Sequence, residues 1–272
     1  MKSLQEYFAA KAFGDLVSWK NQVAAAEKFN STLGEVEEVM LERGWLPARY
    51  QRNRNMLTIA QQLQLFRSSV AVIGCGGLGG YVIEQLARLG VGRIVAIDAD
   101  VFEEHNLNRQ LLSSPRLLGH SKALAAKARI NEINPAVNLV AVEKYFDREN
   151  GPELVAGSRV VVDAVDNIAS RKVLDAVCRE ANIPLVHGAI AGWYGQVSTQ
   201  YPGDTVMERI YGQADDSPGM EKQLGNPSFT PGAAASFQVA EVCKILVGEG
   251  EILRHRKLHM DLLAMETVEV SF

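Results

Sequence analysis

The chain has few of the residues that define several large classes of protein. Only three of its 272 residues are cysteines, Cys75, Cys178 and Cys243, and no two of them form a CxxC pair. This count excludes a four-cysteine zinc site and argues against a disulfide framework. Each thiol is better explained as a small buried hydrophobic side chain than as a nucleophile.

An excess of positive charge and long apolar runs are also lacking. Lys and Arg number 28 against 32 Asp and Glu, which gives a formal net charge of −4. A chain with this balance has no bulk electrostatic attraction for nucleic acid or for an anionic membrane. No uninterrupted apolar run approaches the ~18–20 residues of a membrane span, and the first residues lack the apolar core of a signal peptide. We therefore expect a cytoplasmic protein that binds neither DNA nor membrane.

The composition is otherwise that of a folded domain, since 47% hydrophobic and 22% charged residues exclude a wholly disordered chain. Residues 1–60 differ in sequence pattern from the rest of the chain, and this pattern predicts a helical N-terminal extension. Within it, Thr32-Leu33-Gly34-Glu35 is a capping box that opens a short helix. This extension is expected to be a packing or dimerisation arm or a substrate clamp, and residues 61–272 are expected to form the main domain.

From residue 69 onward, apolar strands alternate with helices. The strands are expected at 69–73, 93–97, 138–142, 159–162 and 184–186. Helices are expected between them at 78–89, 121–133 and 168–181. This alternation predicts an α/β domain, with a Rossmann-like, mainly parallel sheet that carries helices on both faces.

The last third of the main domain has a different pattern. Residues 195–201 alternate like an antiparallel strand, and residues 202–229 are polar and rich in Pro and Gly, which predicts a long loop. Thr230 before Pro231 is predicted to be the N-cap of a helix that ends at Gly248. Two final apolar segments, 257–261 and 266–270, could pair as a closing antiparallel hairpin.

A glycine-rich turn lies between the first strand and the first helix of the main domain. Residues 72–80 read VIGCGGLGG and fit the pattern GxGxxG. Glycines let the backbone approach a phosphate, and the start of the helix offers unpaired N–H groups and a partial positive charge. Asp98 follows Gly74 by 24 residues, at the end of the second strand, where an acid can accept hydrogen bonds from a ribose. The motif alone predicts a nucleotide and would suit NAD, FAD or ATP.

Two cations follow the second strand and separate these options. Arg109 lies in the element Asn-Leu-Asn-Arg-Gln at 106–110, and Lys122 comes 13 residues later. The glycine turn can already accommodate the pyrophosphate of a dinucleotide, so two more cations would be surplus there. A triphosphate attacked at its α-phosphorus develops charge on its phosphate oxygens and on the leaving pyrophosphate, and Arg and Lys can stabilise both. The two cations therefore favour ATP.

A pair of acidic residues ends a later strand, in the sequence Val161-Val162-Asp163-Ala164-Val165-Asp166-Asn167. Ligands of open α/β sheets bind at the carboxyl ends of the strands. A carboxylate there can hold Mg²⁺ against ATP, with water completing the coordination shell. Asp166 is the better candidate because it lies past the strand, whereas Asp163 could be structural and Asn167 could cap the following helix.

Together these motifs resemble the E1-like adenylating enzymes of the MoeB/ThiF/HesA group, which activate ubiquitin-like sulfur carriers. GxGGLG, NLNRQ, a lysine 13 residues past its arginine, and DxxDN occur here in the order seen in that family, and the resemblance covers residues 49–250. The segment Arg49-Tyr50-Gln51-Arg52 is also similar to one in which an arginine reaches the ATP site of the other subunit of a homodimer. Arg52 matches that arginine best, with Arg54 as the alternative.

The resemblance implies a role for each matching residue. The residues implied to bind the nucleotide are Gly74, Gly76, Gly77, Gly79, Asp98, Asn106, Arg109, Gln110 and Lys122. Those implied to act in catalysis are Arg52, Arg109, Lys122 and Asp166, with Asp166 as the Mg²⁺ ligand. The implied cofactors are ATP and Mg²⁺, and the implied reaction converts the C-terminal glycine carboxylate of a carrier that ends in Gly-Gly into an acyl-adenylate. Residues 188–190 and 195–196 resemble the stretch that forms the channel for the carrier tail.

The chain departs from many members of that family in its cysteines. Many relatives bind structural zinc through two CxxC pairs, and some carry a catalytic or sulfur-accepting cysteine in the segment that corresponds to 202–229. This chain has no cysteine in either place. We therefore expect no zinc and a reaction that stops at the adenylate, with sulfur supplied by a separate donor protein.

Other functions remain open at this point. The same adenylation site could act on a small carboxylate or on a tRNA-borne threonylcarbamoyl group. An NAD-dependent oxidoreductase would explain the segment from Gly74 to Asp98 but would leave Arg109, Lys122 and Asp166 unused. A non-catalytic scaffold would have no chemical need for these three residues. The sequence does not name the carrier, or choose between thiamine and molybdopterin synthesis.

Overall fold

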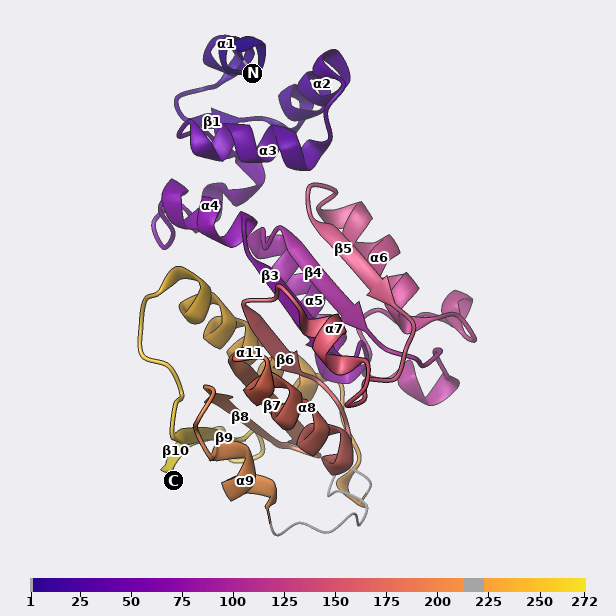
Figure 1. Cartoon of the computed structure of the whole chain (residues 1–272). Helices are drawn as coiled ribbons and strands as arrows, with labels where there is room; N and C mark the ends of the chain where they lie inside the picture. Colours follow the sequence, from indigo (N-terminus) through magenta and orange to yellow (C-terminus); the bar gives the residue numbers. More distant parts are fainter. Residues whose placement is uncertain (1, 213–222) are drawn as a thin grey trace.

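The computed structural model describes residues 2–212 and 223–272, and within them one large sheet has eight strands in the order β10-β9-β8-β7-β6-β3-β4-β5 (Figure 1). Five neighbouring strands run parallel: β3 (Ser69–Ile73), β4 (Arg93–Ile97), β5 (Asn138–Val142), β6 (Val160–Asp163) and β7 (Leu185–Ala191). The remaining strands are antiparallel: β8 (Tyr194–Gln200), β9 (Arg256–Asp261) and β10 (Glu266–Ser271). The predicted mainly parallel sheet with an antiparallel end is therefore confirmed, and so is the closing hairpin.

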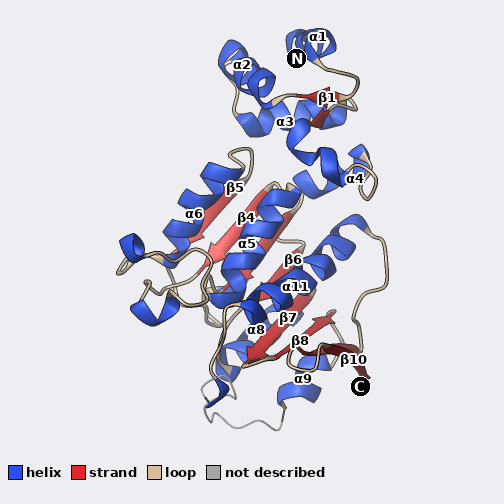
Figure 2. Cartoon of the chain, turned by 180° about the vertical axis from the view of Figure 1, so that it is seen from behind, coloured by secondary structure: helices blue, strands red, loops and turns tan. Residues whose placement is uncertain are grey.

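Helices cover both faces of the sheet, as Figures 1 and 2 show from opposite sides. One face carries α5 (Gly77–Leu89), α6 (Lys122–Ile133) and α11 (Phe229–Val247); the other carries α7 (Gly151–Val155), α8 (Ile168–Glu180) and α9 (Val206–Tyr211). Alternate residues of β3 serve the two faces, since Val70 and Val72 belong to the first core and Ala71 and Ile73 to the second. The two faces explain why the parallel strands are apolar at almost every position.

The N-terminal residues form a separate helical unit with a core of its own around Phe8 and Met40. Its elements are α1 (Lys2–Lys11), β1 (Leu16–Val17), α2 (Trp19–Phe29), α3 (Leu33–Glu42), β2 (Leu46–Pro47) and the short 3₁₀-helix η1 (Ala48–Asn53). The predicted capping box is present, because the hydroxyl of Thr32 accepts from the backbone N–H of Glu35 and the Glu35 carboxylate accepts from that of Thr32. The next helix, α4 (Ile59–Phe66), packs on both α3 and α11, so it crosses the expected boundary at residue 60.

Tyr50 joins the helical unit to the main domain. Its buried hydroxyl donates to Glu37 Oε1 at 2.9 Å and accepts from Asn134 Nδ2 at 2.8 Å. Asn134 follows the last residue of α6, and Gly90, beside the Tyr50 ring, follows the last residue of α5. Helices of a parallel α/β layer end where the strands begin. The helical unit therefore packs at the amino ends of the parallel strands, on the edge of the sheet away from their carboxyl ends (Figure 1).

Two expectations for the C-terminal third are wrong. Part of the predicted loop 202–229 is the helix α9, and residues 213–222 of it lie outside the described residues. Thr230 is not an N-cap: α11 begins at Phe229, and the buried hydroxyl of Thr230 donates to the carbonyl oxygen of Gly192 at 2.7 Å. A partner distant in sequence has decided the position of this side chain.

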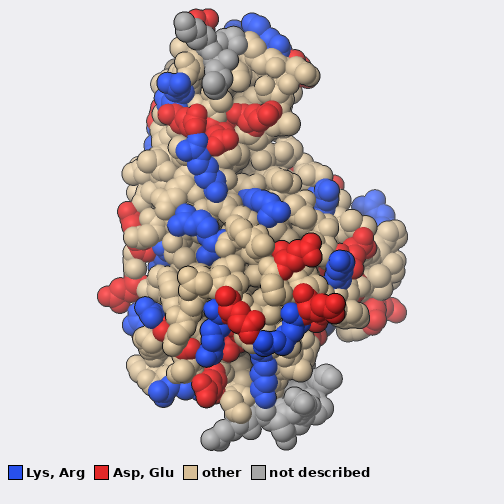
Figure 3. Space-filling view, in the orientation of Figure 1, with Lys and Arg blue, Asp and Glu red and all other residues tan. Residues whose placement is uncertain are grey.

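None of the described helices combines the length and the apolar character that crossing a membrane requires. Figure 3 shows acidic and basic side chains interspersed over one face of the molecule. This mixture agrees with the small net charge of the sequence.

Candidate active site

A cavity of about 740 Å³ opens at the carboxyl ends of β3, β4 and β6. Among the residues with predicted site roles, those that line it are Gly74, Gly76, Gly77, Asp98, Arg109, Gln110, Lys122 and Asp166. Gly79, Asn106 and Arg52 are not among the lining residues. The cavity occupies the edge of the sheet where ligands of open α/β folds bind. The structure thus brings most of the predicted residues to one place, although it does not test their roles.

The segment from the end of β3 through the first turn of α5 has room only for glycine at two positions. Gly74 has a φ of +98°, and a Cβ there would lie 2.5 Å from the carbonyl oxygen of Ala164. A Cβ on Gly79 would lie 1.8 Å from the carbonyl oxygen of Gly74. Gly76 is the N-cap of α5 and supplies no side-chain cap, so the first N–H groups of the helix are left for a ligand. This local geometry suits an anion such as a phosphate.

Asp98 follows β4 and is fixed by two backbone groups. Its Oδ2 accepts from the N–H of Cys75 at 2.7 Å, and its Oδ1 accepts from the N–H of Asp100 at 2.8 Å. Burial raises the pKa of the Asp98 carboxyl, more than these hydrogen bonds and the nearby charge of Lys122 lower it. The carboxylate is therefore held in one orientation beside the glycine turn, where the ribose is expected.

Lys122 is the first residue of α6, and its side chain is only 9% exposed. Its Nζ lies 2.9 Å from Oδ2 of Asp100, and Oδ1 of Asp100 lies 3.5 Å from the hydroxyl of Tyr145. Neither Asp100 nor Tyr145 is predicted from the sequence, although both line the cavity. The available signal for Asp100 was its place two residues past Asp98, in the segment that leaves a strand at the ligand edge.

The NLNRQ element begins at the last residue of the short 3₁₀-helix η2 (Glu104–Asn106) and continues as a loop. Asn106 is buried, and its Oδ1 accepts from the N–H of Glu103 at 3.0 Å, so this side chain stabilises the loop. Gln110 lies against Gly76, and Arg109 donates to the carbonyl oxygen of His105 at 2.8 Å. Gln110 and Arg109 line the cavity, whereas the predicted phosphate contact of Asn106 stays a prediction.

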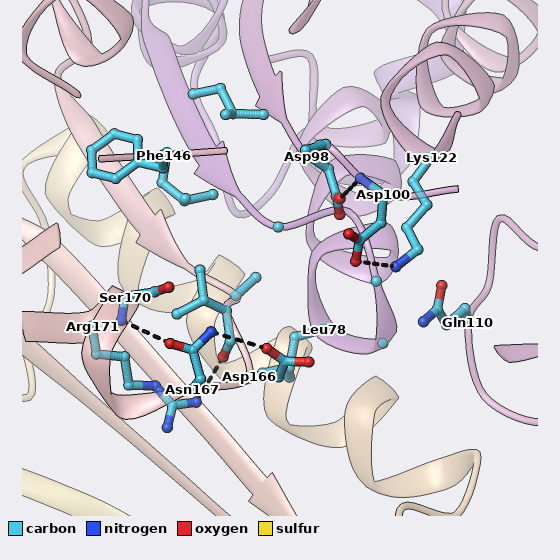
Figure 4. A pocket seen from close by; sticks show the side chains of 18 of the residues that line it. Leu78, Asp98, Asp100, Gln110, Lys122, Phe146, Asp166, Asn167, Ser170 and Arg171 are labelled. Carbon is cyan, nitrogen blue, oxygen red and sulfur yellow. Dashed lines mark hydrogen bonds and ion pairs between the residues drawn. The ribbon is translucent and has the colours of Figure 1, made fainter. Parts of the chain in front are cut away.

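The turn between β6 and α8 carries Asp166 on the other side of the cavity. Figure 4 shows Asp98, Asp100 and Lys122 grouped on one side and Asp166 and Asn167 on the other. The amide of Asn167 caps α8 by accepting from the N–H of Ser170 at 2.8 Å, as predicted. The side chain of Asp166 is exposed, and its Oδ1 accepts from Asn167 Nδ2 at 3.3 Å. Asp166 is thus free of the capping role and available to a ligand.

A buried polar ring lies beneath Asp166, formed by Asp163, Arg171, His187 and Tyr211. His187 Nδ1 lies 2.7 Å from Oδ2 of Asp163, and His187 Nε2 lies 3.2 Å from the hydroxyl of Tyr211. Burial lowers the pKa of His187 despite the bond to Asp163, so the imidazole of His187 is neutral. Its Nδ1–H donates to Asp163, and its Nε2 accepts from the Tyr211 hydroxyl. The sequence suggests a structural role for Asp163 but does not reveal the set, because its members come from β6, α8, β7 and α9.

The arginines before the first strand of the main domain lie in or beside η1, within the helical unit. Arg52 is exposed, Arg54 pairs with Asp15, and Arg49 donates to Glu37 Oε2 at 2.6 Å. None of the three lines the cavity. The expected reach of Arg52 or Arg54 into a second subunit stays a prediction.

The described residues hold no cluster of three or more His, Cys, Asp and Glu side chains placed to bind a metal. This finding does not bear against Mg²⁺ at a nucleotide site, because Mg²⁺ there is usually held by one or two carboxylates, substrate phosphates and water. The exposed carboxylate of Asp166 at the cavity is a donor of this kind. The residues present therefore fit a phosphate-bound Mg²⁺.

Comparison with known proteins identifies relatives over most of the chain. The sequence model of the ThiF family matches residues 50–271. The SAMP-activating enzyme E1 of Haloferax volcanii is 40% identical over 227 residues, which cover 81% of this chain and 84% of that protein. A probable molybdopterin-synthase adenylyltransferase of Porphyra purpurea is 30% identical, over 78% of this chain and 58% of its own length. The chain spans 48% of the adenylyltransferase and sulfurtransferase MOCS3 of Drosophila sechellia, at 31% identity.

Solved structures support the fold. PaaA superposes with a TM-score of 0.68 at 22% identity, and the match covers 82% of each of the two chains. The complex of E. coli MccB with ATP gives a TM-score of 0.66 at 20% identity, over 92% of this chain and 82% of that one. At these identities the likeness shows the α/β architecture alone, whereas the sequence matches show descent. The chain belongs to the ThiF family, the family of the E1-like adenylating enzymes.

Proposed function

We propose that this enzyme uses ATP and Mg²⁺ to adenylate the C-terminal glycine carboxylate of a small ubiquitin-like sulfur carrier of the ThiS or MoaD type. The observation that carries the proposal is one cavity lined by a glycine turn, by Arg109 and Lys122, and by Asp166 on the facing side. Relatives named as activating enzymes and adenylyltransferases support the reaction class. The carrier is proposed from the family resemblance and from these names.

The glycine turn and Asp98 would hold the nucleotide. The first N–H groups of α5, for which Gly76 supplies no side-chain cap, would donate to phosphate oxygens. The Asp98 carboxylate, already oriented by two backbone N–H groups, would accept from the ribose hydroxyls. Gln110, which lies against Gly76, would add a neutral donor to the phosphates.

In the proposed reaction a carboxylate oxygen of the carrier forms a bond to the α-phosphorus of ATP. The bond from that phosphorus to the oxygen bridging to the β-phosphate breaks, and pyrophosphate leaves with that oxygen. Negative charge builds up on the phosphate oxygens and on the leaving group, where Arg109 and Lys122 can stabilise it. Neither residue becomes covalently attached, because this chemistry depends on positioning and on charge neutralisation. A bound Mg²⁺, held by Asp166 and the phosphates, would supply further charge neutralisation.

Lys122 has an unusual starting position for this role. In the structure its ammonium pairs with Asp100, whose carboxylate is 52% exposed. A triphosphate in the cavity would compete with Asp100 for Lys122. Asp100 therefore holds the mostly buried ammonium group of Lys122 in place before the nucleotide arrives.

The carrier and its partners complete the proposal. Ile190, at the end of β7, lines the cavity and belongs to the stretch that resembles the channel for a carrier tail. No cysteine lies in 202–229, so we propose that the enzyme stops at the acyl-adenylate and that a separate donor protein supplies sulfur. We also propose a homodimer in which Arg52 of one subunit serves the ATP site of the other.

The test is exchange of labelled pyrophosphate into ATP with Mg²⁺, with and without small carriers ending in Gly-Gly. Exchange that requires a carrier and is lost in Asp166→Asn would support the proposal and identify the carrier. Asp261→Asn, which makes the same change at the end of β9, before the turn to β10, and keeps an acceptor for the N–H groups of Leu263 and Ala264, is the matched control and should exchange normally. ATP binding without exchange would move the assignment to a small carboxylate or a tRNA-borne group. Binding of NADH in preference to ATP would contradict adenylation altogether.

A further inference from the structure

Both hydrogen-bonding groups of one backbone residue at the candidate site are held by buried side chains. That residue is Val165, which directly precedes Asp166. Its N–H donates to Oδ1 of Asp163 at 3.1 Å, and its carbonyl oxygen accepts from Nη2 of Arg171 at 2.8 Å. The peptide groups on either side of Val165 are thereby fixed, and these groups set where the Asp166 side chain begins.

The two holding side chains are themselves fixed by the buried polar ring described above. Nε of Arg171 lies 3.4 Å from Oδ2 of Asp163, and Nη1 of Arg171 donates to the Tyr211 hydroxyl at 3.2 Å. His187 bridges the same Asp163 oxygen to the same Tyr211 hydroxyl. The four side chains thus close a ring of contacts, in which each member touches two others through a hydrogen bond or an ion pair.

The cost of this arrangement points to a purpose other than stability. Asp163 is 0% exposed and Arg171 is 7% exposed, so two charges have been removed from water. The attraction within such a buried pair often does no more than offset the desolvation cost, and apolar residues of similar volume would serve the core as well. An apolar pair, however, could not hold the N–H and the carbonyl oxygen of Val165.

Arg171 also reaches toward the other side of the site. Its Nη2 lies 3.5 Å from the carbonyl oxygen of Gly188, in the stretch of β7 that resembles the carrier-tail channel. Arg171 itself lines the cavity. One guanidinium group therefore contacts the backbone before Asp166 and the backbone of the neighbouring strand.

We propose that Asp163 and Arg171 are positioning residues that hold the Val165–Asp166 backbone, so that the Asp166 carboxylate meets the metal and the triphosphate in one orientation. They act through Asp166 and do not contact the reacting atoms. The proposal rests on the proposed function, since it assigns Asp166 to the metal. It adds two residues to the site and gives a reason for their burial.

The first test is Arg171→Lys, which keeps the charge but loses the planar, multiply donating head group. Binding of Mn²⁺, as a probe for Mg²⁺, is measured by titration calorimetry with a non-hydrolysable ATP analogue present. We expect the dissociation constant for Mn²⁺ to rise by about 10-fold, the size typical of a lost contact that orients a metal ligand. Binding of the analogue without metal should change by less than about 2-fold. The matched control is Arg179→Lys, also on α8, where the arginine is exposed and pairs with Asp175.

A double variant separates positioning from a general loss of structure. In an Asp166→Asn background, Arg171→Lys should weaken Mn²⁺ binding no further, because the carboxylate through which Arg171 acts is gone. Additive weakening in the double variant would overturn the proposal, as would a folded Arg171→Lys enzyme that binds Mn²⁺ like the unaltered one. If Arg171→Lys does not fold, the same two measurements on Asp163→Asn decide, because that change removes the charge that holds Arg171 against the Val165 carbonyl oxygen. Failure of the unaltered enzyme to exchange pyrophosphate with any carrier counts against the proposed function, whereas these titrations address the positioning alone.

Discussion

The two turns that meet at the cavity are built in opposite ways. The turn from β3 to α5 is made of backbone: Gly76 caps the helix without a side chain, and Gly74 and Gly79 leave no room for a Cβ. The turn from β6 to α8 is made of side chains: Asn167 caps the helix, and Asp163 and Arg171 hold the backbone of Val165. One turn exposes N–H groups, and the other presents a carboxylate.

Each kind of turn makes different demands on the sequence. A backbone turn requires only that certain positions be small, so its requirements are local and visible as a motif. A side-chain turn depends on partners from other elements, here His187 on β7 and Tyr211 on α9. The backbone turn should therefore be sensitive to added volume, and the side-chain turn to the loss of any partner.

The largest expected effect is on the side-chain turn. Asp163→Ala would leave Arg171 buried without its carboxylate, and we expect the free energy of unfolding to fall by about 3–5 kcal/mol. Urea unfolding followed by circular dichroism measures this value. Asp163→Asn, which retains the shape and an acceptor for the Val165 N–H, should lose clearly less, and an equal loss in both variants would show that volume and not charge matters here.

A somewhat smaller effect is expected for added volume in the backbone turn. The Cβ of Gly79→Ala would meet the carbonyl oxygen of Gly74, and forcing the two apart should cost about 3 kcal/mol. Gly232→Ala is the control, because Gly232 lies within α11 and its Cβ would make only ordinary contacts with Tyr81. The control should be as stable as the unaltered protein or slightly more so. Similar unfolding curves for the two variants would refute the close approach.

The side-chain turn should also make the stability of the protein depend on pH, through His187. The folded protein holds His187 neutral with a lowered pKa, so the unfolded chain takes up that proton first as the pH falls. Stability from this group is present above the unfolded value of about 6.5 and is lost below it, at up to about 1.4 kcal/mol per pH unit. Unfolding in urea at several values between pH 5 and 7.5 should show this loss. His187→Gln should flatten the dependence over that range, and an unchanged slope would place the titrating group elsewhere.

The smallest effect is expected at the helix caps. Asn167→Ala removes the acceptor for the N–H of Ser170 and should reduce stability by about 1 kcal/mol, whereas Asn167→Gly should cost only a few tenths. Thermal unfolding can resolve the two. The comparison between turns would be weakened if both variants behaved like the unaltered protein, because the amide would then contribute nothing to the start of α8.

The sequence predicts the architecture well wherever the signal is local. Short apolar runs and helical patterns predict the parallel strands and their helices, and the capping box at Thr32 is seen directly in the hydrogen bonds. Strand β7 is longer than expected, because Gly188 looks like a strand end. Gly188 lies inside the strand, and its lack of a Cβ makes room for Gln238 of α11. A Cβ on residue 188 would lie only 2.4 Å from the Gln238 side chain. Such an approach between distant segments leaves no trace in a local pattern.

The candidate site also has one part that local motifs predict and another part that they do not. The glycine turn, the two cations and Asp166 stand out as motifs, and the structure places them on one cavity. Asp100 escapes notice because its role is to pair with Lys122, 22 residues away. Helix α9 is missed because its apolar residues Met207 and Tyr211 are interpretable only against the core that they join. The parts of the site that the sequence does not reveal are those whose role depends on a partner distant in the chain.

The contact between Gly74 and Ala164 has a consequence for how the two turns stay in register. The space where a Cβ of residue 74 would stand is taken by the carbonyl oxygen of Ala164, so the turns touch directly. Repulsion between touching atoms rises steeply with compression, and it changes little with ionic strength or proton concentration. This contact therefore sets the smallest separation between the proposed phosphate-binding turn and the turn that carries Asp166. Salt and buffer can alter the charges on the two turns but not this minimum separation.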